Sequence, residues 1–265
     1  MISMLKHVIL ATSLLSTPVV AQSAPETAQE APVHATYAAY AHGLNVMNLD
    51  TALTMTPEGY RLEVAFRLTG LVGFFVHGDS KTIVEGRFDG GQAEPRELFS
   101  AGHLRGVQRI TQIDWRNGIP NMTQLIPPVE QERDPVPVAE QAHTIDTLSA
   151  MATLLREVAD RGRCEGESQT FDGRRLSKIS AHTVGDEVLL HTGRSSFQGQ
   201  ALRCDFEGQQ LAGFLRDANQ ADLRKPQRGS AWFAHVMPGA PPIPVRIVFQ
   251  TRQFGMTTMY LTGVS

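Results

Sequence analysis

The segment that most constrains the fold begins CEGESQTFDGRR (residues 164–175) and ends GQALRCDFEGQQLAGF (199–214). It contains both cysteines of the chain. The dipeptides Asp172-Gly173 and Glu207-Gly208 are turn signals that separate runs of strand-forming residues. The segment therefore predicts consecutive antiparallel strands, and the two cysteines are placed where they could link its first part to its last.

Cys164 and Cys204 enclose a loop of about forty residues. Because the N-terminus has the pattern of an export signal, the simplest interpretation of the pair is a disulfide. A disulfide that closes a loop of this length contributes about 3–4 kcal/mol in the chain-entropy estimate. A metal site is a weaker alternative, since neither cysteine belongs to a Cys-x-x-Cys pair, and an oxidising compartment would cap a catalytic thiol.

Residues 1–21 predict a cleaved signal peptide. Lys6 supplies the positive charge, residues 8–20 form a short apolar run without an acid, and Val19-Val20-Ala21 is a small-residue cleavage site. An N-terminal membrane anchor is the alternative, but a spanning helix needs about 20 apolar residues. Residues 22–35 would form a disordered leader. We therefore expect a periplasmic protein with no stable membrane span.

The composition indicates a folded protein, because 42% of the residues are hydrophobic and 19% are charged. The formal net charge of -3 gives no electrostatic footprint for nucleic acid. Residues 36–265 are long enough for one large β domain with a substantial core. We expect a single domain over this range.

Residues 60–69 carry the clearest strand pattern outside the cysteine-containing segment. Their apolar positions recur at every second residue, which is the period of an antiparallel strand with one buried face. These positions are Tyr60, Leu62, Val64, Phe66 and Leu68. The compact apolar run at residues 71–76 also predicts a strand. Turn signals such as Asp89-Gly90 recur along the chain, so the sequence predicts a mainly β protein built as an antiparallel meander.

Residues 145–159 predict the principal helix. Its apolar residues recur at three and four positions, and either Thr144 or Asp146 could cap its start. The apolar positions are Ile145, Leu148, Met151, Ala152, Leu155 and Val158. The preceding residues 127–141 contain four prolines and four acids, which suits an extended, mobile loop or, as the alternative, a domain linker.

Short motifs follow one another over most of the mature chain. They include Tyr37-x-x-Tyr40-x-x-Gly43, Thr69-Gly70-Leu71, Phe171-Asp172-Gly173-Arg174-Arg175, Gly199-x-Ala201-x-x-Cys204, Gly213-Phe214, Ala231-Trp232-Phe233 and Pro244-Val245-Arg246. With these motifs the chain resembles the exported bacterial family named domain of unknown function 3108. The resemblance departs at Thr147, where the family often has proline.

This resemblance implies a strongly curved antiparallel half-barrel, or open barrel, wrapped round one principal α-helix. Such a fold is similar to that of the periplasmic lipoprotein-carrier proteins. The family has no established catalytic residues that could be carried over to this chain. The resemblance therefore defines the expected fold and compartment more sharply than the function.

Asp172, Arg174 and Arg175 form the sharpest polar cluster of the sequence. Arginine forks suit carboxylate or phosphate groups, so these three residues are candidates for an anion site at the rim of the sheet. The alternative is a hairpin turn in which the aspartate supports the backbone and the arginines form surface ion pairs. We favour the turn and keep the cluster as a candidate ligand site.

Three residues of the C-terminal strands complete the candidate ligand site. Trp232 and Phe233 could line a ligand cavity, although such aromatic residues more often belong to the core. Arg246 is flanked by Val245 and Ile247, so its side chain is expected on the face opposite to theirs. As its partner we considered Asp172 or Asp146.

No catalytic motif emerges from the sequence. Gly193-Arg194-Ser195-Ser196-Phe197 does not match the nucleophile elbow, and neither a zinc-protease motif nor a phosphate-binding loop is present. His182 and His191 could face each other across a turn as a two-histidine metal site, but two surface histidines are the simpler interpretation. We therefore predict no catalytic residues, no metal and no cofactor.

The preferred hypothesis is a non-catalytic periplasmic protein that binds an apolar or acylated ligand, or an envelope component, and supports the integrity of the cell envelope. Its candidate partners are a lipid, an acylated molecule or an envelope protein. A first alternative is an interaction scaffold that uses the loops at residues 127–141 and 224–228. A second is a hydrolase of envelope polymer, which would need paired acids in one cleft.

Overall fold

A computed structural model describes residues 31–251 and 255–265, so the predicted signal peptide and the leader as far as residue 30 lie outside the described residues. Within the described ranges, one antiparallel sheet contains thirteen strands in the order β7-β6-β5-β4-β3-β2-β1-β13-β12-β11-β10-β9-β8. The strands are β1 (Val33–Ala41), β2 (Leu44–Met55), β3 (Gly59–Leu68), β4 (Gly78–Asp89), β5 (Gln92–Leu104), β6 (Val107–Arg116), β7 (Ile119–Ile126), β8 (Gly166–Phe171), β9 (Leu176–Leu189), β10 (Gly199–Ala212), β11 (Gln227–Ala234), β12 (Ile243–Thr251) and β13 (Gly255–Val264).

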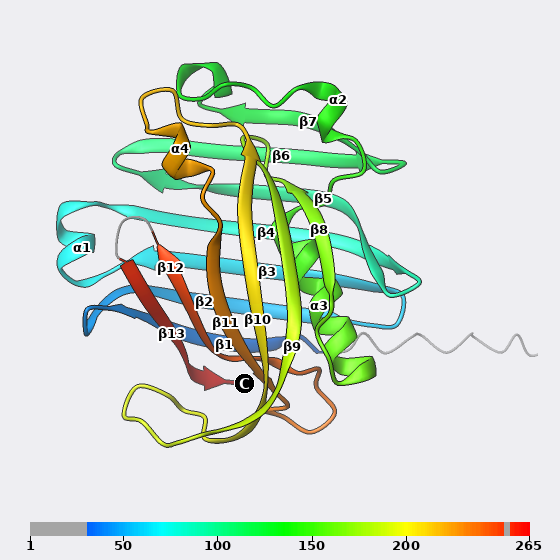
Figure 1. The fold of residues 1–265 in the computed structure, drawn as a ribbon, viewed down its shortest axis with the longest axis vertical. Helices are drawn as coiled ribbons and strands as arrows, with labels where there is room; N and C mark the ends of the chain where they lie inside the picture. The colour runs from blue at the N-terminus through cyan, green and yellow to red at the C-terminus, as the bar shows by residue number, and fades with distance from the viewer. Residues whose placement is uncertain (1–30, 252–254) are drawn as a thin grey trace, which may run out of the picture.

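The sheet consists of two meanders that are joined through the first and the last strand. β1 pairs with β13, for example Ala39 with Met259, and this pairing connects β1–β7 to β8–β13. Figure 1 shows β1–β7 as one layer and β8–β12 crossing in front of it. β7 and β8 form the two edges, so the sheet curls without closing. The prediction of a mainly β, strongly curved half-barrel wrapped round one α-helix is confirmed.

The core lies between the two layers, on the face of each that is turned toward the other. We call this the inner face, and the opposite one the outer face. Side chains at every second strand position point inward, as the strand period requires. Buried inner-face residues of both layers include Tyr37, Leu62, Val84, Ile113, Phe171, Phe233, Val245 and Leu261.

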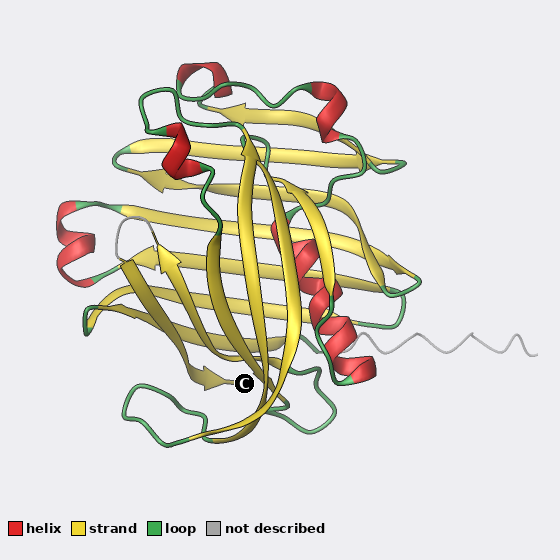
Figure 2. Ribbon diagram, in the orientation of Figure 1, coloured by secondary structure: helices red, strands yellow, loops and turns green. Residues whose placement is uncertain are grey.

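Helix α3 (Thr147–Arg161) packs against β4, β5 and β8 at one side of the molecule (Figure 2). Its apolar stripe buries Ala152, Leu155 and Val158. The helix starts and ends two residues later than predicted, because Asp146 is its N-cap and Gly162, with φ of 63°, is the left-handed residue after its last turn.

The N-cap of α3 belongs to a buried polar network. Asp146 is fully buried and accepts hydrogen bonds from the backbone N–H groups of Leu148 and Ser149, each at 2.9 Å, and from the Ser149 hydroxyl. The Tyr60 hydroxyl of β3 donates to Ser149 Oγ at 2.7 Å. Burial raises the pKa of Asp146, and the hydrogen bonds from Ser149 and Leu148 offset only part of that rise.

The raised pKa of Asp146 predicts a pH-dependent stability that the Asp146→Asn variant lacks. A folded-state pKa above the unfolded one stabilises the protein at low pH, and this contribution is lost as the pH rises through the folded-state pKa. Relative to Asp146→Asn, the wild type should therefore lose of the order of 1 kcal/mol as the pH rises above about 4. Urea denaturation across this range measures the difference. Asp89→Asn, at an exposed turn, is the control, and a relative stability that rises with pH would contradict the prediction.

Residues 127–141 are packed against the sheet and do not form a uniformly extended loop. They contain a turn of 3₁₀ helix, η1 (Val129–Gln131), and the short helix α2 (Val138–Gln141). Arg133 Nη1 donates to the Gly213 carbonyl at 2.9 Å, and the Asp134 N–H donates to the Phe214 carbonyl at 3.0 Å. The segment thereby connects the β7 edge to the end of β10.

The prediction of a strand at residues 71–76 is wrong. The segment forms the short helix α1 (Gly70–Phe75), which follows Thr69 and buries none of its residues. Gly70, with φ of 59°, adopts the left-handed conformation that turns the chain out of β3. An apolar run of this length is compatible with either element, so the periodicity alone could not separate them. Among the described residues, no helix combines the length and the hydropathy that crossing a bilayer requires.

Candidate functional site: a groove on the outer face

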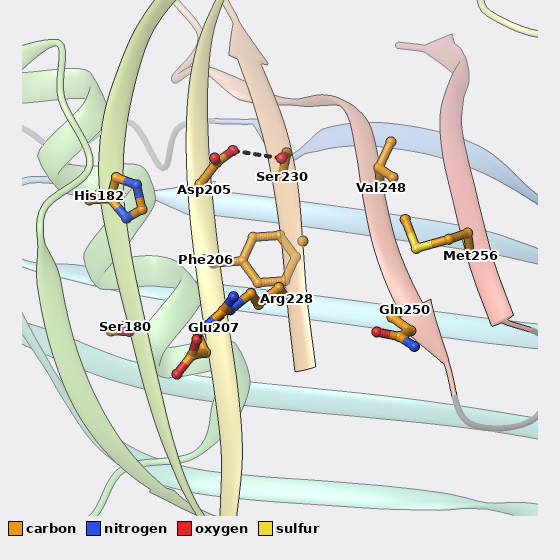
Figure 3. A pocket seen from close by; sticks show the side chains of 11 residues that line it. Ser180, His182, Asp205, Phe206, Glu207, Arg228, Ser230, Val248, Gln250 and Met256 are labelled. Atoms are coloured by element: carbon orange, nitrogen blue, oxygen red, sulfur yellow. Dashed lines mark hydrogen bonds and ion pairs between the residues drawn. The ribbon is translucent and has the colours of Figure 1, made fainter. Parts of the chain in front are cut away.

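The outer face of β9–β13 carries a groove of about 630 Å³ (Figure 3). The register brings its side chains together: Asp205 lies opposite His182 and Ser230, and Ser230 lies opposite Val248. Directly paired residues of antiparallel strands share a face. We call this the outer groove, which is lined by Ser180, His182, Asp205, Phe206, Glu207, Arg228, Gly229, Ser230, Val248, Gln250 and Met256.

Its walls combine apolar and polar groups. Phe206 lies against Gly229, and a Cβ at that glycine would meet the ring at 2.4 Å, so a side chain there would displace it. Val248 and the exposed Met256 add apolar surface from β12 and β13. At the end formed by β10 and β11, Arg228 Nε donates to Glu207 Oε2 at 2.7 Å.

A band of charged and aromatic side chains crosses the outer face next to the groove. The register aligns one residue from each of four neighbouring strands, in the order Arg203, Trp232, Arg246 and Tyr260. A second row of paired residues, which contains Asp205 and Ser230, crosses the same strands. Each residue of the band is two positions along its strand from a residue of that row. Because that spacing is about 6.6 Å, the band runs beside the outer groove, whose lining does not include its four side chains.

The acids of this band are held as carboxylates by arginine. Arg203 donates to Glu187 Oε1 at 2.8 Å and to Asp205 Oδ1 at 2.9 Å, and Trp232 Nε1 donates to Glu187 Oε2 at 2.8 Å. Hydrogen bonds from Arg203 and Trp232 lower the pKa of Glu187. Burial would raise the pKa of Asp205, but hydrogen bonds from Ser230 and Arg203 lower it overall. Neither acid is poised as a proton donor at neutral pH, which disfavours the hydrolase hypothesis.

Arg246 differs from Arg203 in forming no ion pair, although its charge also helps to lower the pKa of the nearby Glu187. Its guanidinium carbon lies 4.7 Å from the Trp232 ring centre and 5.9 Å from that of Tyr260, which are cation–π distances. Its Nε is buried and makes no hydrogen bond, and among the described residues no carboxylate lies within ion-pair distance. The expected pairing with Asp172 or Asp146 is therefore wrong. A half-buried guanidinium with an unused Nε donor favours an anion.

The remaining candidate residues lie elsewhere. Phe233 follows Trp232 on β11, so it points to the inner face, where it is 1% exposed in the core. Of the predicted residues, the structure thus brings together Trp232 and Arg246. Glu187, Arg203 and Tyr260 were not predicted, although the alternating charges Arg203, Asp205 and Glu207 indicate a polar outer face on β10.

Asp172, Arg174 and Arg175 form the turn between β8 and β9. Asp172 Oδ1 accepts the backbone N–H groups of Arg174 at 2.9 Å and Arg175 at 2.7 Å, and its other oxygen pairs with Arg175. Arg174 is buried, and its Nη2 donates to the Ile126 carbonyl of β7 at 2.7 Å. These contacts support the turn and join the two sheet edges. Asp172 and Arg175 also line a smaller cavity of about 230 Å³ beside Thr147.

The cysteines form the predicted disulfide between Cys164 and Cys204, with the Cα atoms 6.1 Å apart. His182 lines the outer groove, and His191 follows β9. No set of three or more histidine, cysteine, aspartate or glutamate side chains in the described ranges could hold a metal ion.

The fold and the outer groove define an open, barrel-like antiparallel sheet protein with a solvent-accessible outer face. The chain belongs to the family described as "Protein of unknown function (DUF3108)", whose family profile matches residues 36–262. This match confirms the resemblance inferred from the sequence motifs. No curated protein matches the sequence.

Solved structures of similar fold are distant in sequence. A β-barrel-like protein of the domain of unknown function DUF1849 from Brucella abortus is 11% identical, with a TM-score of 0.53, over 89% of this chain and 97% of that one. This likeness supports the fold alone. A protein designated a lipoprotein from Parabacteroides distasonis (9% identity, TM-score 0.36, 89% and 96% covered) overlaps less. The same holds for a domain designated outer membrane lipoprotein-sorting from Vibrio parahaemolyticus (11% identity, TM-score 0.20, 89% and 85% covered).

Proposed function

We propose that the protein is a non-catalytic binding protein of the cell envelope, and that its outer groove holds a molecule with an anionic group and an apolar chain. The observation that carries this proposal is Arg246, a guanidinium stacked on Trp232 beside the groove, which forms no ion pair and whose Nε makes no hydrogen bond. A carboxylate or phosphate of the ligand would take up its donors. The apolar chain would lie along Val248 and Met256.

The outer face suits this role better than the interior of the half-barrel. Helix α3 and the inner-face side chains of both layers fill the space inside the curled sheet. An acyl chain there would have to displace close-packed core residues. The free-energy cost of this displacement exceeds that of binding in a surface groove. We therefore expect the ligand on the outer face of the sheet and not on its concave face.

The disulfide and the predicted signal peptide both support the proposed compartment. Cys164 and Cys204 are both buried and bonded to each other, and such bonds persist in oxidising compartments. With the predicted signal peptide, this supports export to the periplasm. An acylated or anionic envelope component would be available to the protein there.

Replacement of Arg246 by glutamine should weaken binding of an anionic amphiphile at least tenfold. A hydrogen bond to a charged group is worth about 1.5–3 kcal/mol, and 1.4 kcal/mol corresponds to a factor of ten. Dodecanoate is the anionic probe and its glycerol monoester the neutral one. The emission of Trp232 reports binding in a Trp115→Phe background, because Trp115 is buried and donates to the Thr144 carbonyl at 2.8 Å.

The matched control is Arg228→Gln at the other end of the groove, where the exposed arginine is paired with Glu207. It should leave the dissociation constant for dodecanoate within about twofold, since exposed ion pairs contribute little. The neutral ester should bind both variants equally. The proposal is wrong if dodecanoate does not bind the wild type, or binds Arg246→Gln as tightly.

A further inference from the structure

Six exposed apolar side chains gather at the end of the sheet where β1, β3 and β5 finish. They come from α1, from the first residue of β2, and from the turn between β5 and β6. We call them the apolar rim: Leu44, Leu71, Phe74, Phe75, Leu104 and Val107. Phe74 and Phe75 are 75% and 78% exposed, and their rings meet edge to face with centres 5.2 Å apart.

The three segments of the apolar rim are neighbours in space. The Thr69 N–H, just before α1, donates to the Val46 carbonyl of β2 at 3.0 Å. The Arg105 N–H, in the β5–β6 turn, donates to the His77 carbonyl after α1 at 2.9 Å. Figure 1 shows α1 and the adjoining turns at the same side of the sheet, away from α3. The three segments that carry the rim therefore adjoin one another.

Exposure of this kind is costly in water. Burial of a phenylalanine side chain is favourable, yet neither phenylalanine of α1 contributes to the core. Contiguous exposed apolar surface marks a site of interaction with another protein or a membrane. The side chains stand on a short helix and on the ends of neighbouring strands.

The charges beside the rim identify the surface it fits. Arg67 at the end of β3 and Arg105 in the β5–β6 turn are exposed, and neither forms an ion pair with any described residue. Asp79 lies opposite Arg67 in the register and is 3.8 Å from His103. The chain as a whole has a net charge of -3, so the positive charge of these two arginines beside the rim contrasts with the overall charge of the protein. Basic residues that flank exposed aromatic side chains favour an anionic lipid surface.

We propose that the apolar rim docks the protein reversibly on an anionic lipid bilayer. Phe74 and Phe75 would enter the interfacial layer, where aromatic rings are favoured, while Arg67 and Arg105 contact the lipid phosphates. This site is separate from the outer groove and does not depend on the proposed ligand. It gives the protein a second activity, namely attachment to a membrane surface without a spanning helix.

Flotation with vesicles tests the proposal. The full mature chain is mixed with vesicles of phosphatidylethanolamine and phosphatidylglycerol, or with vesicles of phosphatidylcholine alone. The wild type should float with the anionic vesicles. The double variant Phe74→Ser/Phe75→Ser should lose about a hundredfold in partitioning, about tenfold for each ring. Arg67→Gln/Arg105→Gln should lose about tenfold or more on anionic vesicles, since each charge near the surface contributes about 1 kcal/mol.

Val138→Ser/Leu190→Ser is the matched control, because these side chains are 81% and 79% exposed away from the rim. It should float like the wild type. The proposal is overturned if the wild type stays unbound, if the phenylalanine variant floats equally well, or if light scattering shows that the rim instead joins two copies of the chain. Urea denaturation of Phe74→Ser/Phe75→Ser shows whether this variant is folded, so that the test does not depend on ligand binding in the groove.

Discussion

Loss of the disulfide between Cys164 and Cys204 is expected to lower the free energy of unfolding by about 4 kcal/mol. The two cysteines are 40 residues apart in sequence, and the bond restricts the unfolded chain over that whole length. In the folded state it ties the segment before β8 to β10, across the intervening strand β9. The Cys164 N–H also donates to Thr183 Oγ1 of β9 at 2.9 Å, which holds the same junction.

Urea denaturation of the oxidised protein, the reduced protein and Cys164→Ala/Cys204→Ala measures this effect. Reduction should shift the midpoint of the oxidised protein strongly and leave the alanine variant unchanged, which is the internal control. The alanine variant should resemble the reduced wild type, apart from the small change in packing at two buried positions. A loss below about 1 kcal/mol would show that the unfolded chain is already compact in this region.

Phe233→Ala and Trp232→Ala should both lower stability, because both side chains are buried, but they should differ in their effect on ligand binding. Phe233 is 1% exposed on the inner face, so its truncation leaves a cavity and should cost about 3–5 kcal/mol of stability. Trp232 is on the outer face, between Arg203 and Arg246. Its removal deprives Arg246 of its stacking partner and should weaken dodecanoate binding at least tenfold, as loss of Arg246 does.

Denaturation and calorimetric titration of both variants separate the two effects, since calorimetry does not need the tryptophan. Phe233→Ala should bind dodecanoate with nearly wild-type affinity at a temperature where it is folded. Phe233→Leu, which preserves most of the volume, is the control for packing and should recover most of the stability. Equal losses of affinity in both alanine variants would mean that the ligand enters the core, which contradicts the outer-face site.

Several elements could be predicted because their signals are local. The alternation at residues 60–69 reappears as β3, with Tyr60 and Leu62 buried, and the stripe around Leu155 reappears as the buried face of α3. The run at residues 71–76 was assigned wrongly because a short apolar segment has no period that separates strand from helix. Its exposure, which underlies the membrane proposal, depends on what packs beside it.

The candidate site could be predicted only in part. Trp232 and Arg246 stood out as chemical types, but their contact requires a particular register between β11 and β12. Arg246 was expected to pair with an acid, whereas its neighbours across the strands are the rings of Trp232 and Tyr260. Conversely, two residues that follow one another in the sequence, Trp232 and Phe233, point to opposite faces of the sheet.

The strand period, the helix cap at Asp146 and the turn at Asp172 can be predicted from residues that are close together in the sequence. These features depend on backbone geometry and on hydrogen bonds between near neighbours. The amino-acid sequence therefore suffices for a mainly β chain with one principal helix and, through the cysteine pair, for a link between residues 164 and 204. Which face holds a groove, which arginine has no acid, and which apolar run stays in water depend on pairings between residues far apart in the chain. Those pairings are settled by packing and register across the whole sheet, and they exist only in the folded molecule.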